Sequence, residues 1–119
     1  MTVLQAIQNA DEIRPNAIPD RRKARFAYEL EGDFAEMMGV DVPENIYGTG
    51  DEATHELLMP YPKDRVYELY IAAMIDHEQM DFDLYNADIL IANAAIDDAK
   101  AWWKRTHGGD QRGRRFKVM

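Results

Sequence analysis

Histidine is the side chain best suited to acid–base chemistry and metal binding near neutral pH, and this sequence has three: His55, His77 and His107. None of them has a second histidine or a carboxylate at a spacing typical of metal ligands. His77 lies between Asp76 and Glu78, but adjacent residues of a helix do not face each other. We therefore expect His77 to be packed and hydrogen-bonded on an apolar helix face. We expect His107 to stabilise a helix C-terminus, where the helix dipole favours a cation.

Carboxylates are the second group that could do chemistry, as calcium ligands or as a hydrolytic pair. The string Asp76, Glu78, Asp81 and Asp83 lacks the spacing and the glycine of an EF-hand loop, so a solvated turn is expected there. With 22 acidic residues some carboxylate pair is always available, so a pair has no specificity for a hydrolase. The sequence has no cysteine, no nucleophile elbow, no P-loop and no dinucleotide fingerprint. We expect no enzymatic activity, no cofactor and no metal site.

Helices would have to position these side chains. The spacing of apolar residues predicts four helices, over residues 3–13, 20–38, 63–80 and 83–107. Thr2 is typical of a helix start and Gly39 of a helix end. Because the turn before residue 83 is short, the last two helices should form a long antiparallel hairpin. The predicted fold class is all-α: a small bundle of about four helices, with a long loop over 39–62 that includes a short extended piece at 56–59.

The chain length indicates a single domain. Its 119 residues, 46% of them hydrophobic, are enough for one real core and too few for two. We expect a helical domain over 1–107 and a flexible, basic C-terminal tail over 108–119. No apolar run is long enough to span a bilayer, and the acidic first residues do not resemble a signal peptide, so we expect no membrane association.

The predicted helix over 83–107 carries more apolar surface than one partner helix needs. Its main apolar face comprises Tyr85, Ile89, Ala92, Ile96, Ala99 and Trp103. Leu84, Ile91, Ala95 and Trp102 widen that face. The helix is therefore expected to be central in the bundle, or to offer part of its surface to another subunit. Trp103 is expected in the core, and Trp102 in the core or at a subunit contact.

The formal net charge of −8 is unevenly distributed. Residues 14–25 include five basic side chains, whereas residues 26–62 hold nine acids and no Lys or Arg. Solvated faces explain most charge runs of this kind. Alternatively, a positive edge and a negative edge suit head-to-tail contact between identical copies. The net negative charge disfavours a simple duplex-DNA binder, because it repels the phosphates of DNA.

The last residues are basic again. They include Arg112, Arg114, Arg115, Phe116 and Lys117. Four basic residues and one aromatic are a weak patch for nucleic acid. Two interpretations of these residues remain. They are a loose chain end, or a segment that becomes ordered when it docks on an acidic partner surface, and docking is the first hypothesis for their function.

Several short motifs follow one another in a specific order. They are Arg14-Pro15-Asn16, Pro19-Asp20, Glu29-Leu30-Glu31-Gly32, Asp64-Arg65-Val66-Tyr67-Glu68-Leu69-Tyr70, Ala73-Met74-Ile75-Asp76, Tyr85-Asn86, Asn93-Ala94-Ala95 and Trp102-Trp103-Lys104-Arg105-Thr106-His107. Together they resemble the small head–tail connector (adaptor, or head-completion) proteins of long-tailed bacteriophages and related prophages, over most of the chain up to His107. The turn Gln79-Met80-Asp81 departs from the Asn-Gly-Glu that relatives often carry, and Ala87 replaces an Asn. The basic tail is not part of the shared pattern.

The resemblance implies a structural protein of the virion neck, assembled in the host cytoplasm. Such proteins form a ring under the portal, usually with its twelvefold symmetry, and extend the DNA channel. They also provide the surface on which the tail or a stopper protein docks. The expected partners are therefore further copies of the chain (a dodecamer), the portal protein, and a stopper or tail-terminator protein. Genomic DNA would pass through the lumen without sequence-specific binding.

Two groups of residues are candidates for these contacts. The expected subunit or portal interface comprises Arg21, Arg22, Arg25, Trp102, Arg112, Arg114, Arg115, Phe116 and Lys117. The expected acidic face that lines or rims the channel comprises Glu29, Asp33, Glu36, Asp41, Glu44, Asp51 and Glu52. Like-charge repulsion at such a face would let DNA slide past without adhering.

The alternative is a small helical binding module, such as a tail-assembly chaperone or a prophage DNA-binding regulator. A regulator predicts affinity for duplex DNA and a dimer. A connector requires neither, and predicts co-purification with portal or ring formation on it. A gel shift and a mass measurement in the presence of portal separate the two.

Overall fold

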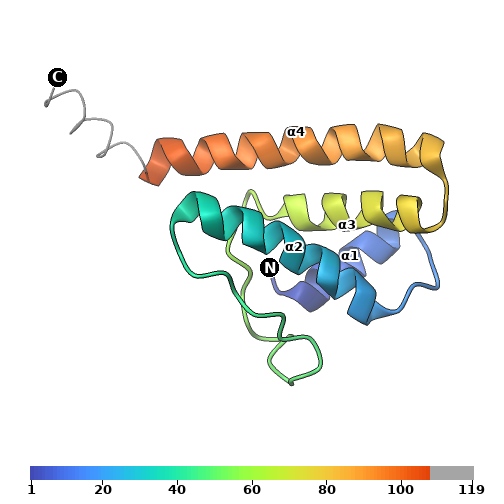
Figure 1. Cartoon of the computed structure of the whole chain (residues 1–119), viewed down its shortest axis with the longest axis horizontal. Helices are drawn as coiled ribbons and strands as arrows, with labels where there is room; N and C mark the ends of the chain where they lie inside the picture. Colours follow the sequence, from blue (N-terminus) through green and yellow to red (C-terminus); the bar gives the residue numbers. More distant parts are fainter. Residues whose placement is uncertain (108–119) are drawn as a thin grey trace, which may run out of the picture.

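The structure is a computed structural model that describes residues 1–107, an all-α bundle of four helices (Figure 1). The helices are α1 (Val3–Ile13), α2 (Asp20–Met38), α3 (Arg65–Glu78) and α4 (Phe82–His107). The predicted all-α class and the four predicted helices are confirmed, α1 and α2 with the expected bounds and α3 and α4 to within two residues at each end. Within residues 1–107, no helix has the combined length and apolar character that a bilayer crossing requires.

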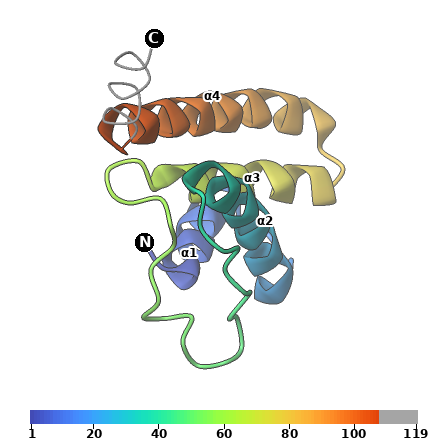
Figure 2. The same cartoon turned by 60° about the vertical axis from the view of Figure 1, so that its left-hand side comes forward.

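Helix α3 is the centre of the bundle. It packs against each of the other three helices, with α4 on one side and α1 and α2 on the other (Figures 1 and 2). Seven of its 14 residues are buried. Although α4 is longer, at 26 residues, it buries only Ala92, Ile96 and Ala99. Of the two alternatives for α4, the central position is therefore wrong, and a contact with another subunit stays a prediction. Helix α4 forms an outer layer on α3, which leaves its far side to solvent.

Local signals define two of the helix ends. At the start of α1, the Thr2 hydroxyl accepts from the Gln5 N–H at 3.3 Å, and the Gln5 side chain accepts from the Thr2 N–H at 2.9 Å. This reciprocal pair is a capping box. At the end of α2, Gly39 adopts the left-handed conformation (φ 72°), and the Val40 N–H donates to the Ala35 carbonyl at 3.1 Å. Both ends lie where the sequence predicted them.

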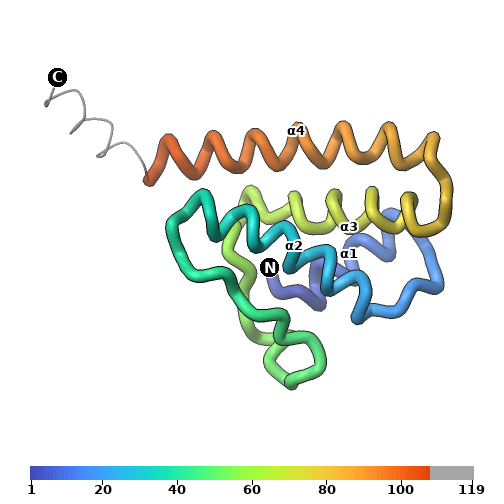
Figure 3. Tube along the Cα trace, in the orientation of Figure 1, coloured from blue at the N-terminus to red at the C-terminus, as the bar shows by residue number. Residues whose placement is uncertain are grey.

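A turn over residues 79–81 folds α4 back on α3, so the two helices form the predicted antiparallel hairpin (Figure 3). The Asp81 N–H donates to the Asp76 carbonyl at 2.9 Å, and Asp81 Oδ1 accepts from the Leu84 N–H at 3.3 Å. Met80, the residue before Asp81, is at φ 60°, in the left-handed region that favours glycine. The strained residue is therefore followed by one whose N–H and carboxylate are both hydrogen-bonded.

The long loop connects α2 to α3 over residues 39–64, two residues longer than predicted. Its second half is held against the bundle: Leu57 and Met59 are buried, and the Leu57 N–H donates to the Met1 carbonyl at 2.9 Å. The expected extended piece is present as an isolated β-bridge between Glu56 and Thr2. Residues 40–55 are mostly exposed. The loop thus has an anchored half and a solvent-facing, acidic half.

Candidate interaction surfaces

Three arginines at the start of α2 form a basic end of the bundle. Arg21, Arg22 and Arg25 are all exposed. Arg22 Nη1 lies 2.9 Å from the Glu78 carboxylate, and Arg25 Nε lies 3.6 Å from the Glu29 carboxylate. Exposed ion pairs of this kind contribute little to stability. The three guanidinium groups are exposed, as an interface with an external partner would require.

Lys23 belongs to the same basic run but to the interior of the bundle. It is buried, with its ammonium 2.7 Å from Asp11 and 3.1 Å from Asp20. Burial alone would lower the pKa of Lys23, but its hydrogen bonds to these two carboxylates outweigh that effect and raise the pKa. The prediction that all basic residues of 14–25 form a positive edge is therefore wrong for Lys23. It is also wrong for Arg14, which is described next.

Arg14, the residue that ends α1, connects three helices. Its Nε donates to Asp76 Oδ1 on α3 at 3.1 Å, and its Nη2 donates to Asp88 Oδ2 on α4 at 2.8 Å. Asp76 is fully buried, and its Oδ2 has no hydrogen-bond partner within residues 1–107. Burial, together with the neighbouring Asp88, raises the pKa of Asp76 to about 6 in spite of Arg14. The expectation of a solvated turn is therefore wrong for Asp76.

The predicted acidic face is mostly exposed, as expected, and runs from α2 into the loop. Its exposed members are Glu29, Asp33, Glu36, Asp41, Glu44 and Asp51. Asp33 is paired with Lys100 of α4 at 2.9 Å. Glu52 differs, because its carboxylate accepts the backbone N–H groups of Gly48 at 3.1 Å and Gly50 at 2.9 Å. Hydrogen bonds from the backbone of Glu52 itself and of Gly50 lower the pKa of Glu52. Glu52 thus shapes the loop, and the outward acidic surface consists of the other six residues.

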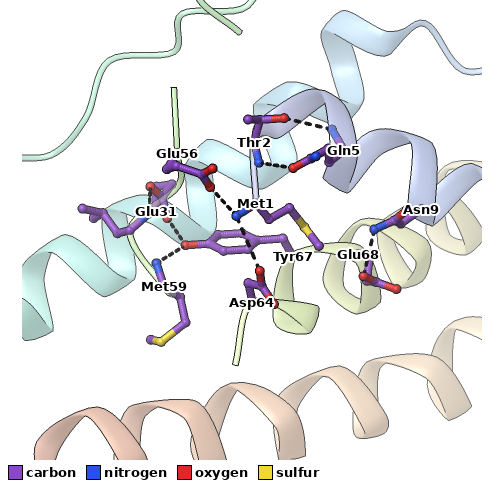
Figure 4. A network of polar contacts seen from close by, with 11 residues as sticks. Met1, Thr2, Gln5, Asn9, Glu31, Glu56, Met59, Asp64, Tyr67 and Glu68 are labelled. Carbon is purple, nitrogen blue, oxygen red and sulfur yellow. Dashed lines mark hydrogen bonds and ion pairs between the residues drawn. The ribbon is translucent and has the colours of Figure 1, made fainter. Parts of the chain in front are cut away.

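A buried polar network joins α2, α3 and the loop (Figure 4). The Tyr67 hydroxyl donates to the Glu31 carboxylate, which also accepts the Leu58 N–H at 2.9 Å. The Met59 N–H donates to the Tyr67 oxygen at 2.8 Å. Burial raises the pKa of both Glu31 and Tyr67. The network satisfies one buried acid and two backbone groups of the loop.

The role of Glu31 was not predicted from the sequence, in which it is one of the nine acids of residues 26–62. A signal was present: Glu31 lies one turn from Ala27 and from Phe34, two apolar residues that share one side of a helix with it. An acid at such a position has to find donors, because an unpaired buried charge is costly. The donors come from the loop and from α3, neither of which is local in sequence.

The C-terminal end of α4 is an aromatic cluster. Trp102 and Trp103 are half-buried against the core, as expected. The His107 ring stacks on Trp103 with centroids 4.5 Å apart, and its Nδ1 lies 3.1 Å from the Trp103 carbonyl oxygen. Thr106 Oγ1 donates to the Trp102 carbonyl at 3.1 Å. His107 and Thr106 therefore contact carbonyl groups of the last turn of α4, where the predicted capping role of His107 requires them.

The other helix histidine was predicted less well. His77 is exposed at the hairpin turn, where its ring meets Phe82 and Tyr85 edge to face, with centroids 5.7 Å and 5.0 Å apart. The expectation of a packed, hydrogen-bonded imidazole on an apolar face is therefore wrong. Over the described range 1–107, no group of three His, Asp or Glu side chains could hold a metal ion.

The far side of α4 carries exposed apolar residues among charged ones such as Asp97 and Asp98, and the rest of the described chain does not cover them. Leu90 is 70% exposed, Ile91 56% and Leu84 38%. We call this the outer face of α4, and it comprises Leu84, Ala87, Leu90, Ile91, Ala94 and Ala101, all exposed. Of the four residues predicted to widen the apolar face, Leu84 and Ile91 are exposed here, whereas Ala95 and Trp102 are half-buried against the core. Exposed apolar residues on one side of a helix are candidates for an interaction site.

Comparison with protein-family models, with curated proteins and with solved structures finds no match to this chain. Its surfaces therefore have to be interpreted from their own chemistry. They are the basic start of α2, the acidic end of α2 with the loop, and the apolar outer face of α4. The tail candidates Arg112, Arg114, Arg115, Phe116 and Lys117 lie outside the described residues.

Proposed function

We propose that this chain is a structural subunit of a phage neck, a connector that assembles with further copies into a ring docked on the portal. The ring extends the DNA channel and offers the attachment surface for the tail or a stopper protein. It has the twelvefold symmetry of the portal. The subunit acts through shape and charge in the virion, after assembly in the host cytoplasm, and performs no catalysis.

The observation that carries this proposal is the separation of opposite charges along α2. Exposed arginines stand at its first turns, and exposed acids occupy its second half and the following loop. At 1.5 Å per residue, α2 is about 28 Å long, so the two ends are distinct surfaces. A positive end that meets the negative end of the next copy makes a heterologous contact, and such contacts generate rings when the rotation closes. Charge complementarity also directs the order of assembly.

The acidic surface supports the second part of the proposal. Six exposed carboxylates give this side a negative potential, and within residues 1–107 only Asp33 among them forms an ion pair with another helix. A negative lumen repels the phosphates of passing DNA and prevents adhesion. The net charge of −8 has the same effect on the whole subunit.

The test is to mix the purified full chain with portal assemblies and to follow the mass of the complex. Rings on portal are expected for the native chain. Arg21→Glu should abolish them, because it reverses the exposed basic end. Arg65→Glu makes the same charge change at an exposed site on α3 and should leave ring formation intact. A native chain that stays solitary with portal, or that loses rings equally in both variants, contradicts the proposal.

A DNA-binding regulator is the other function to be tested. The resemblance and the acidic surface argue against it, because a regulator needs a basic surface toward phosphates. A gel shift with duplex DNA separates the two functions. Retarded DNA together with no binding to portal would favour the regulator.

A further inference from the structure

We propose that a second copy of this chain covers the outer face of α4, so that two α4 helices pack antiparallel about a two-fold axis. The outer face is on α4, whereas the proposed ring contact uses the two ends of α2. The two contacts therefore involve different surfaces, and neither requires the other.

The exposed residues of α4 have the spacing of a coiled-coil seam. Residues alternately three and four apart along a helix form one stripe that can pack against a second helix. The seam positions are Leu84, Ala87, Ile91, Ala94, Asp98 and Ala101. Asp98 is the only charged member of these six, and its carboxylate lies 2.7 Å from the ammonium of Lys63 in the same subunit. The stripe is therefore apolar or neutralised over its full length.

The seam is complementary in size to an antiparallel copy of itself. One register places Ile91 opposite Ala94 of the second copy, and the same register places Leu84 opposite Ala101 of the second copy. Each large side chain then meets a small one, which fills space without overlap. The two-fold axis repeats each of these contacts. Alanines at every seventh position also let the two backbones approach closely.

Charge favours the same antiparallel register. Exposed Asp83 is in the first turn of α4, and exposed Lys104 and Arg105 are in its last turn. In the register above, Asp83 lies beside Lys104 of the second copy, and symmetry makes two such pairs. A parallel arrangement would instead place like charges together at both ends, which is unfavourable. The sizes of the seam side chains and the charges at the ends of α4 therefore both favour the same antiparallel arrangement with a second copy of the chain.

The oligomeric state of the full chain tests this arrangement by sedimentation velocity over a range of concentrations. The native chain should sediment as a species of twice 13.7 kDa. Ile91→Glu places a carboxylate at the centre of the seam and should raise the dimer dissociation constant by roughly 30-fold or more, as the loss of an interface hot spot does. Because Ile91 is 56% exposed, the variant should keep its fold, which circular dichroism checks. Asn93→Glu is the matched control: it adds the same charge on the exposed polar side of α4 and should leave the dimer unchanged.

A charge exchange tests the antiparallel register itself. Asp83→Lys alone and Lys104→Asp alone should each weaken the dimer, whereas the combined variant should restore it. A native chain that is monomeric at every concentration, or a dimer that Ile91→Glu leaves intact, overturns the proposal. A dimer that the combined variant does not restore overturns the antiparallel pairing. Arg21→Glu should leave this dimer unchanged, so failure of the ring and failure of the dimer are distinguishable.

Discussion

The hydroxyl of Tyr67 donates a hydrogen bond to the buried carboxylate of Glu31, and this contact joins α3 to α2 inside the core. The same hydroxyl oxygen accepts the Met59 N–H at 2.8 Å, so one side chain satisfies an acid and a backbone group of the loop. The Tyr67 ring also packs edge to face on Phe34, with centroids 5.8 Å apart. The Tyr67 hydroxyl is therefore one of the anchors of this half of the loop, beside the Leu57 and Leu58 backbone hydrogen bonds.

Tyr67→Phe should lower the free energy of unfolding by about 2 kcal/mol, because it leaves the buried Met59 N–H without its partner and removes one of the two hydrogen bonds that the buried Glu31 carboxylate accepts. Chemical denaturation measures this loss. Tyr61→Phe removes the same hydroxyl from a residue that is 83% exposed, and should change the stability very little. Equal effects in the two variants would show that the buried network contributes nothing.

Arg14→Ala should be among the most destabilising substitutions, at roughly 3 kcal/mol, since it leaves Asp76 buried without a counter-charge. Arg22→Ala breaks an exposed pair with Glu78 and should cost at most about 1 kcal/mol. Thermal or urea unfolding of the two variants gives the comparison. The prediction fails if Arg22→Ala costs as much as Arg14→Ala.

Stability should depend on pH through Asp76. An ordinary aspartate ionises near pH 3.9, whereas the pKa of Asp76 in the folded chain is about 6. Between these values the folded chain binds more protons than the unfolded chain, so the free energy of unfolding should fall as the pH rises from about 4 to about 6. Burial raises the pKa of Glu31 too, and its contribution has the same sign.

Urea denaturation at a series of pH values measures how the free energy of unfolding changes with pH. Asp76→Asn cannot titrate and should flatten the fall in stability between pH 4 and 6, leaving the part that other acids contribute. Asp97→Asn removes an exposed acid from α4 and should keep the native slope. An unchanged slope in Asp76→Asn would contradict the raised pKa of this group.

Met80→Gly should stabilise the hairpin turn. Met80 is at φ 60°, where an L side chain costs about 1–2 kcal/mol, and its side chain is 77% exposed, so little burial is lost. Glycine is more flexible in the unfolded chain, which reduces the expected net gain to about 0.5–1 kcal/mol. Gly39→Ala makes the opposite change at φ 72° and should destabilise by about 1 kcal/mol. Thermal unfolding should show a higher melting temperature for Met80→Gly and a lower one for Gly39→Ala.

Features that depend on neighbouring residues were predictable from the sequence. The capping box at Thr2, the left-handed Gly39 and the hairpin between α3 and α4 all follow from residues within a few positions of one another. Helical periodicity also identified the apolar face of α4 and its surplus. The exposure of Arg21, Arg22 and Arg25 follows the general rule that charged side chains lie at the surface unless a buried partner exists.

The tertiary structure alone decided which charged residues are buried and which helix is central. Arg14, Lys23, Glu31 and Asp76 look like surface residues in the sequence, because the partners that make their burial possible lie on other elements. The periodicity of apolar residues shows that a helix has an apolar face, but it does not show how many other helices pack against that helix. Helix α3 therefore became the centre, and α4 the outer layer with an uncovered face, only when the chain packed.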